Sequence, residues 1–215
     1  MAGYIASLFT ILAAATVRVA CATVPAVPHD MYSSSVDVLG CKINPNRIAS
    51  WPMPVDCNNI CVRLSYNGRS LELLCLDQST GSYDISYDAY NYLVTGQSAT
   101  VNPIYGGIVN MEVEQVPPEE CLECLRVGRL PLSAPNSMNF VPACLGQPDS
   151  WVARNYLLFN IYDPVCHWGY DELYILDLVV SNQPSCPHPL GTTNGRLPDT
   201  VFNIQYGTGA VVPAL

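Results

Sequence analysis

The segment from Ser70 to Leu93 reads SLELLCLDQSTGSYDISYDAYNYL and carries the pattern that decides the fold. Its first half is an apolar run that only Glu72 interrupts, and it ends at Asp77 before polar and glycine residues. A short run bounded in this way predicts a strand that is buried on both faces. Asp84 follows the polar residues, so Asp77 and Asp84 are expected at the two ends of one tight loop.

The second half of the segment has the pattern of a short helix. Ser86 is a suitable N-cap residue, Asp88 falls in the first turn, and apolar or aromatic residues follow as far as Val94. Gly96 then supplies a residue at which such a helix ends. The sequence therefore predicts a buried strand, a tight loop and a capped helix, in that order.

This order of elements resembles the double-psi β-barrel domain of RlpA-like proteins, expansins, barwin and a small endoglucanase family. The resemblance continues in GIVNMEVE (107–114) and in the cysteine-flanked CNNICVRL (57–64), and it extends over residues 40–116. It implies a mainly β chain, with a double-psi β-barrel, short helices and a disulfide-pinned C-terminal extension. The alternative is the same strand, turn and helix within another β-rich fold.

The N-terminal residues have the features of a signal peptide. The apolar run 5–15 is too short to span a bilayer comfortably, and Ala20-Cys21-Ala22 offers small residues before a signal-peptidase cut. We therefore expect a secreted, extracellular product that begins at Thr23 and has no membrane anchor. The predicted regions are a signal peptide (1–22), an extended lead-in (23–38), a double-psi β-barrel-like region (39–117), and a cysteine-containing β-rich extension, separate or part of the same domain (118–215).

The extension is expected to contain three further strands. WVARNYLLFNIY (151–162) fits both a strand and a helix, and its aromatic content favours the strand. The apolar YILDLVV within 170–180 predicts a buried strand, and 201–206 a short last one.

The chain is acidic, with 18 Asp and Glu residues against 9 Lys and Arg residues and a net charge of −9. It has no clustered basic stripe, which argues against nucleic acid and anionic membranes as partners. The charge itself suits solubility outside the cell.

Nine of the ten cysteines follow the predicted cleavage site, and their spread suits disulfides in an oxidising compartment. An odd number leaves one thiol unpaired or paired between molecules, so a monomer is expected, with a disulfide dimer as the alternative. Cys75 is our choice for the unpaired thiol, because it lies within an apolar strand. The disulfide candidates are Cys41, Cys57, Cys61, Cys121, Cys124, Cys144, Cys166 and Cys186.

Cys121-Leu-Glu-Cys124 has the spacing of a zinc or redox pair. Zinc needs a second pair at ligand spacing, and His167 and His188 are far apart in the sequence. We therefore interpret both cysteines as structural and expect no metal and no cofactor.

Asp84 is the candidate catalytic residue if the protein is hydrolytic. In the resembled endoglucanases the Asp of a His-Phe-Asp motif is the general acid, and the matching residues here are Ser82, Tyr83 and Asp84. A glycosidase also needs a second carboxylate. Asp37 and Asp56 are the nearby candidates, and neither lies in a matching motif. The alternative is that Asp84 binds backbone amides at the start of the helix.

Binding without hydrolysis needs aromatic faces beside hydrogen-bonding groups. Large aromatic residues also serve as core residues, and an Asp next to a loop is commonly solvated or a cap. The candidate binding residues are Asp77, Tyr83, Asp84, Tyr87 and Trp51.

The sequence thus favours a secreted, non-catalytic, expansin-like or effector-like protein that binds cell-wall polysaccharide or an extracellular host protein. A fungal source is suggested only by the general character of a cysteine-rich secreted chain. One alternative is a glycoside hydrolase that acts on β-glucan with Asp84 as general acid. A second alternative is a secreted protease inhibitor.

Overall fold

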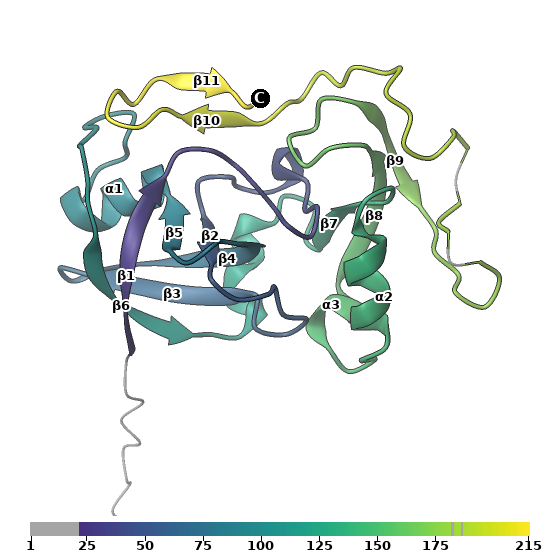
Figure 1. The fold of residues 1–215 in the computed structure, drawn as a ribbon, viewed down its shortest axis with the longest axis horizontal. Helices are drawn as coiled ribbons and strands as arrows, with labels where there is room; N and C mark the ends of the chain where they lie inside the picture. The colour runs from purple at the N-terminus through teal and green to yellow at the C-terminus, as the bar shows by residue number, and fades with distance from the viewer. Residues whose placement is uncertain (1–21, 182, 186) are drawn as a thin grey trace, which may run out of the picture.

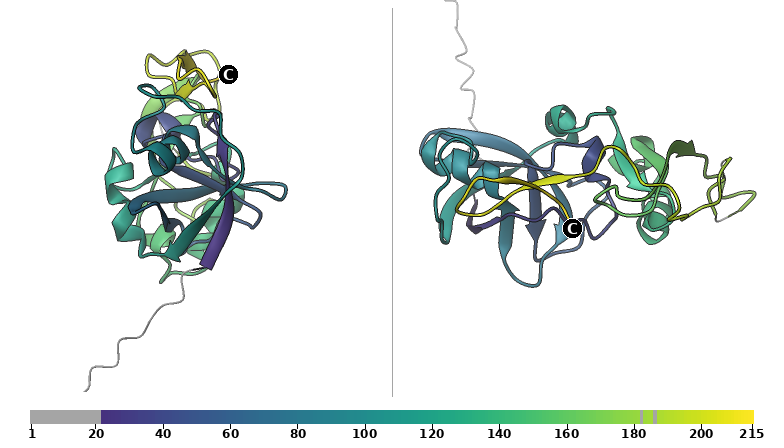
Figure 2. Two further views of the ribbon diagram at one scale, coloured as in Figure 1. Left: turned by 90° about the vertical axis from the view of Figure 1, so that its left-hand side faces the viewer. Right: turned by 90° about the horizontal axis from the view of Figure 1, so that it is seen from above.

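The computed structural model describes residues 22–215 except residues 182 and 186. A β-barrel lies at one side, and a three-stranded sheet with helices α2 and α3 lies at the other (Figure 1). The C-terminal hairpin β10-β11 runs across the top of the barrel, as the view from above also shows (Figures 1 and 2). Among the described residues, no helix has the length and apolar character needed to cross a membrane.

Six strands close into the barrel in the order β1-β5-β2-β4-β3-β6. The pairs β1/β5 and β2/β4 are parallel, and the other pairs are antiparallel. This closed, mainly β architecture with short helices confirms the predicted fold class. The strands are β1 (Ala22–His29), β2 (Ile48–Trp51), β3 (Cys61–Tyr66), β4 (Arg69–Gln78), β5 (Tyr83–Ser86) and β6 (Val109–Gln115).

The strand predicted between residues 70 and 77 forms most of β4 and faces two cores. Leu73 points into the barrel, whereas Leu74 and Leu76 pack outside it, and all three are fully buried. Because successive side chains of a strand point to opposite faces, this continuous apolar run requires a core on each side. The prediction of a strand buried on both faces is confirmed.

Helix α1 (Tyr87–Thr95) closes one end of the barrel and confirms the predicted helix. Ser86 is its N-cap residue, and Gly96 ends it in the left-handed conformation at φ 83°. Ala89 and Leu93 from its buried face pack against the residues inside the barrel.

The C-terminal part has its own sheet, in the order β7-β8-β9, and a two-stranded hairpin, β10-β11. The strands are β7 (Leu130–Ser133), β8 (Tyr156–Ile161), β9 (Gly169–Tyr174), β10 (Phe202–Ile204) and β11 (Val211–Pro213). The helices are α2 (Phe140–Leu145), α3 (Trp151–Arg154), and the 3-10 helices η1 (Gly40–Lys42), η2 (Pro118–Cys124) and η3 (Ser137–Asn139).

One core joins this part to the outside of the barrel. Ile48, Leu74 and Leu76 belong to the same buried cluster as Leu132 and Val152. Three disulfides pin the extension, as predicted. They are Cys41–Cys166, Cys57–Cys144 and Cys61–Cys121.

The predicted lead-in (23–38) is wrong, because β1 occupies its first residues. Val24 and Ala26 are buried, and β1 pairs with β5 on one side and β6 on the other. Pro25 and Pro28 are unfavourable inside a sheet, but the strand forms because its partners come from residues far along the chain. The barrel region therefore begins at Ala22, not at residue 39.

Two of the strands predicted in the extension are also corrected. The stretch 151–162 is divided between a helix and a strand. The Ser150 hydroxyl accepts a 3.3 Å hydrogen bond from the amide of Ala153 and caps the start of α3, and β8 begins only at Tyr156. The strand predicted over 170–180 ends at Tyr174, and Val179 is 96% exposed. Beyond Tyr174 no neighbouring strand of the described structure continues the sheet. The predicted last strand is present as β10.

The cysteine predictions have different outcomes. Cys75 is a free thiol, as predicted, but Cys124 is also free and buried, so its assignment to a disulfide is wrong. Cys186 lies outside the described residues. The predicted signal peptide does too, apart from Ala22, and it stays a prediction.

Candidate binding site at the barrel mouth

Two carboxylates flank a serine in a row across three adjacent barrel strands. Ser50 on β2 faces Asp84 on β5 and Asp77 on β4. Its hydroxyl donates a 3.0 Å hydrogen bond to Oδ2 of Asp77, and the Ser33 hydroxyl donates another at 2.6 Å. β4 ends at Gln78 and β5 begins at Tyr83, which confirms that Asp77 and Asp84 border one tight loop.

Three consecutive serines hold the chain between β1 and β2 against this row. Besides Ser33, the Ser34 hydroxyl donates to the carbonyl of Leu76 at 2.9 Å, and the Ser35 hydroxyl accepts from the amide of Gln78 at 3.0 Å. Asp77 is therefore an anchored, half-buried residue and not a solvated loop residue. The sequence analysis did not select Ser33 or Ser50. The three consecutive serines 33–35 are the sequence feature that could have indicated Ser33.

Asp84 lies within β5 and does not bind the start of α1. Its Oδ2 accepts a 2.7 Å hydrogen bond from the Ser82 hydroxyl, whereas the N-cap position belongs to Ser86. The cleft beside Asp84 has a free volume of about 30 Å³. This is of the order of one water molecule, so a sugar ring does not fit without movement. The cleft is bordered by His29–Ser33, Pro45, Asn46, Ile48, Ser50, Asp84–Asp88 and Phe202–Ile204.

A wider groove of about 270 Å³ opens at the mouth of the barrel, on the other side of β2. Trp51 and Cys75 form part of its wall, and Asp77 lies at its polar side. The remaining lining residues are Met53, Pro54, Val55, Asp56, Asn59 and Gln115. Apolar walls with a few polar groups are the usual composition of a ligand site.

Trp51, in the wall of this groove, packs against Tyr83. Their rings meet edge to face with centroids 5.4 Å apart. Trp51 is 8% exposed, so it supplies an edge and not an open stacking face. Within the described structure its Nε1 is buried and has no hydrogen-bond partner.

Tyr87 borders the Asp84 cleft but packs as a core residue, and its selection as a binding residue stays a prediction. It is 1% exposed, its hydroxyl donates to the carbonyl of Ile104 at 2.8 Å, and it accepts from the amide of Gly207 at 3.2 Å. Its ring also packs on Tyr206. The ring and the hydroxyl of Tyr87 thus both contact the C-terminal hairpin.

The two candidates for a second carboxylate do not border the Asp84 cleft. Asp37 is half-buried at a positive φ of 59°, and burial raises the pKa of its carboxyl. Asp56 accepts hydrogen bonds from the amides of Asn58 and Asn59 at 2.6 and 2.7 Å, which is a local turn. Asp77 lies closer to Asp84 in the sheet, because both are paired with Ser50.

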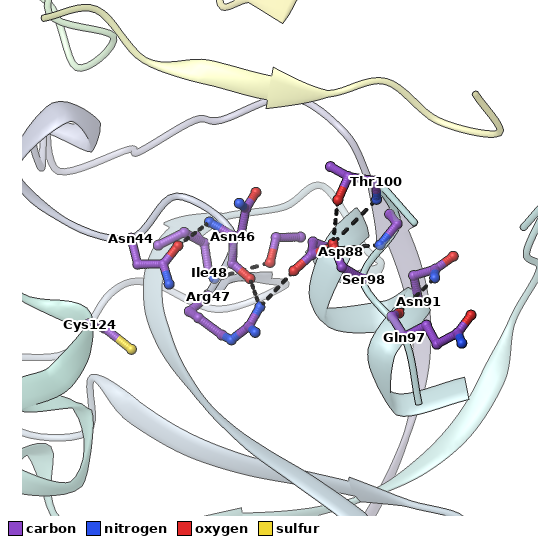
Figure 3. A network of polar contacts seen from close by, with 12 residues as sticks. Asn44, Asn46, Arg47, Ile48, Asp88, Asn91, Gln97, Ser98, Thr100 and Cys124 are labelled. Atoms are coloured by element: carbon purple, nitrogen blue, oxygen red, sulfur yellow. Dashed lines mark hydrogen bonds and ion pairs between the residues drawn. The ribbon is translucent and has the colours of Figure 1, made fainter. Parts of the chain in front are cut away.

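A polar network fixes β2 relative to α1 (Figure 3). Arg47, just before β2, points toward Asp88 in the first turn of α1, and the two lie 3.1 Å apart. The second oxygen of Asp88 accepts from the Ser98 hydroxyl at 2.5 Å and from the amide of Ala99 at 2.9 Å. Asp88 is 7% exposed, so of the two ordinary roles for such an Asp, solvated residue or hydrogen-bonding cap, the structure excludes the first.

The cysteine pair of η2 is not a zinc pair in this structure. Cys121 is bonded to Cys61, and Cys124 is a buried thiol. Within the part of the chain that the structure describes, no group of three or more His, Cys, Asp or Glu side chains has the geometry to hold a metal ion.

Comparisons with protein-family models and with curated proteins found no match to this chain. Among solved structures, the chain is similar to the solution structure of the fungal elicitor cerato-platanin, at 16% sequence identity and a TM-score of 0.30. That similarity covers 44% of this chain and 96% of cerato-platanin.

Proposed function

We propose that this chain is a secreted, non-catalytic protein of the expansin-like type that binds cell-wall polysaccharide at the barrel mouth. The observation that carries the proposal is the contrast between the two cavities that border β2. The acid at the catalytic position of the resembled family lies in a cleft with room for about one water, whereas the neighbouring groove is nine times larger. Binding is therefore favoured over turnover.

The chemistry of the groove fits a carbohydrate. Met53 offers apolar surface and Trp51 an aromatic edge for the C–H groups of a sugar, and Asp77 and Asn59 offer hydrogen-bonding groups beside them. Secretion is supported by three disulfides, which persist in oxidising compartments.

A glycoside hydrolase that acts on β-glucan is the second candidate, and the row across β5, β2 and β4 favours it. Neighbouring strands lie about 4.8 Å apart, so the Cα atoms of Asp84 and Asp77 are about 10 Å apart. An inverting pair needs its two carboxyl groups about 6.5–9.5 Å apart, which side chains on Cα atoms at this distance are long enough to reach. Against this assignment, Asp77 is already bound by two serine hydroxyls.

A polysaccharide pull-down combined with a reducing-sugar assay on the same preparation tests the proposal. Retention without soluble product supports it, and soluble product supports the hydrolase. Neither retention nor product would favour a host protein as the ligand, or inhibition of a protease. Met53→Glu places a charge in the groove at a residue that is 46% exposed, so folding should be unaffected. We expect retention to fall by about tenfold or more, equivalent to about 1.4 kcal/mol.

Met31→Glu is the matched control. Met31 is 56% exposed and borders the Asp84 cleft instead of the groove. We expect it to bind like the wild type. If Met31→Glu loses binding and Met53→Glu does not, the ligand site is the Asp84 cleft and the proposed site is wrong.

A further inference from the structure

Cys121 has two cysteine neighbours, and it is bonded to only one of them. Its disulfide partner Cys61 lies on β3, with the two Cα atoms 5.9 Å apart. Cys124 follows three residues later in the same 3-10 helix, η2. Side chains three residues apart in a 3-10 helix lie on one face, and a rise of about 2.0 Å per residue places their Cα atoms about 6 Å apart. That separation lies within the range of disulfides.

All three sulfur atoms belong to one buried region. Cys61 and Cys121 are fully buried, Cys124 is 7% exposed, and all three are members of the core cluster that joins the barrel to the C-terminal part. The Cys124 thiol lies 4.0 Å from the carbonyl oxygen of Glu72. Cys61 is paired with Leu74, two residues further along the same strand. The free thiol and the disulfide therefore lie over one short stretch of β4.

The groups around the Cys124 thiol lower the fraction of reactive thiolate but do not abolish it. Burial raises the pKa of Cys124, the Arg47 guanidinium opposes that shift, and the carboxylates of Glu72 and Glu123 add to it. Figure 3 places Cys124 beside the polar network that contains Arg47. An intramolecular reaction needs no access from solvent, so burial slows this thiol toward external reagents more than toward a sulfur in its own helix.

We propose that Cys61, Cys121 and Cys124 form a thiol–disulfide exchange site. The Cys124 thiolate attacks Sγ of Cys121, the bond between Cys121 and Cys61 breaks, and Cys61 leaves as a thiolate that takes up the proton lost by Cys124. One disulfide and one thiol are present before and after, so the step needs no oxidant or reductant. The last turn of η2 tightens to close the new bond, and η2 is released from β3.

The test follows which cysteines are free over time in the wild-type secreted protein. Samples are incubated near neutral and at alkaline pH, quenched in acidic denaturant, alkylated with N-ethylmaleimide, and mapped by mass spectrometry without reduction. We expect the label to shift from Cys124 to Cys61 as a Cys121–Cys124 disulfide appears. The initial rate should rise by about tenfold per pH unit while the thiol is mostly protonated.

Two variants make the result specific. Cys124→Ala should show no label on Cys61 at any time, and Cys75→Ala, which removes the other described free thiol, should exchange like the wild type. The proposal is overturned if Cys61 stays unlabelled in the wild type under conditions that keep it folded. It is also overturned if Cys124→Ala exposes Cys61 equally, or if the new disulfide joins Cys61 to Cys124.

Discussion

The guanidinium of Arg47 lies 3.1 Å from the carboxylate of Asp88, so the residue just before β2 is tied to the first turn of α1. The side chains are 22% and 9% exposed, which keeps the pair mostly away from solvent. β2 carries Ser50, which lies between Asp77 and Asp84, and Trp51, which lines the groove. This ion pair therefore positions both parts of the candidate site.

Replacement of Asp88 by Ala should destabilise the protein. The change removes the partner of Arg47 and the acceptor of the Ser98 hydroxyl and the Ala99 amide, so we expect a loss of about 2–4 kcal/mol. Urea unfolding followed by fluorescence measures it. Asp149→Ala is the control, because the Asp149 side chain is 95% exposed in its pair with Arg154, and it should change stability by less than about 0.5 kcal/mol. Equal effects of the two variants would contradict the structural role given to Asp88.

Asp84→Asn should leave the protein folded and should remove no enzymatic activity. The carboxylate contributes one hydrogen bond with Ser82, so a stability change of about 1 kcal/mol or less is expected. Thermal unfolding and a reducing-sugar assay on β-glucan measure the two properties. A wild type that releases soluble oligosaccharide, together with an Asp84→Asn variant of equal melting temperature that releases none, would establish the hydrolase instead.

Asp37→Asn should alter how stability depends on pH. Burial raises the pKa of Asp37 above its ordinary 3.8, so the folded state holds this proton more tightly than the unfolded state. The contribution of Asp37 to stability is therefore present at low pH and is lost as the pH rises from the unfolded pKa through the folded one. Asn stays neutral and tolerates the positive φ. The melting temperature of the variant relative to the wild type should increase across this window, and parallel profiles would contradict the prediction.

Cys75 and Cys124 should react with a thiol reagent only after unfolding. Both are free. Cys124 is buried, whereas Cys75 is half-buried in the groove wall and is unreactive because desolvation raises the pKa of its thiol to about 12. Mass-spectrometric mapping of the unreduced protein should find both labelled in denaturant and nearly unlabelled in native buffer. Label on Cys41, Cys57 or Cys144 would contradict the three disulfides.

The local pattern predicted the elements whose signals lie within a few residues. Leu73, Leu74 and Leu76 predicted a strand with two buried faces, and Ser86 and Gly96 predicted both ends of α1. β1 was missed because no residue near Pro25 indicates that β5 and β6 will pair with it. Its conformation depends on contacts formed by residues many positions away.

The candidate site was predicted only in part, for a related reason. Trp51, Tyr83, Asp77 and Asp84 do lie around β2, and Asp77 and Asp84 do border one loop. Tyr87 has the same residue type and sequence neighbourhood as Tyr83, yet the hairpin β10-β11 covers it. Ser50 is paired with Asp77 because the register shifts between Ala49 and Ser50, and no sequence pattern predicts that shift.

The closing of the barrel by β1 has a consequence for the time course of synthesis. β1 is made first, but its partner residues on β6 follow some eighty positions later, from Val109 onward. At a synthesis rate of about 5–20 residues per second, this strand waits roughly 4–17 s for its antiparallel neighbour. Pro25 and Pro28 lack backbone N–H donors and so make it a poor template for pairing with other chains. Pro25 and Pro28, which made the strand hard to predict, thus limit its pairing with other chains until β6 has been synthesised.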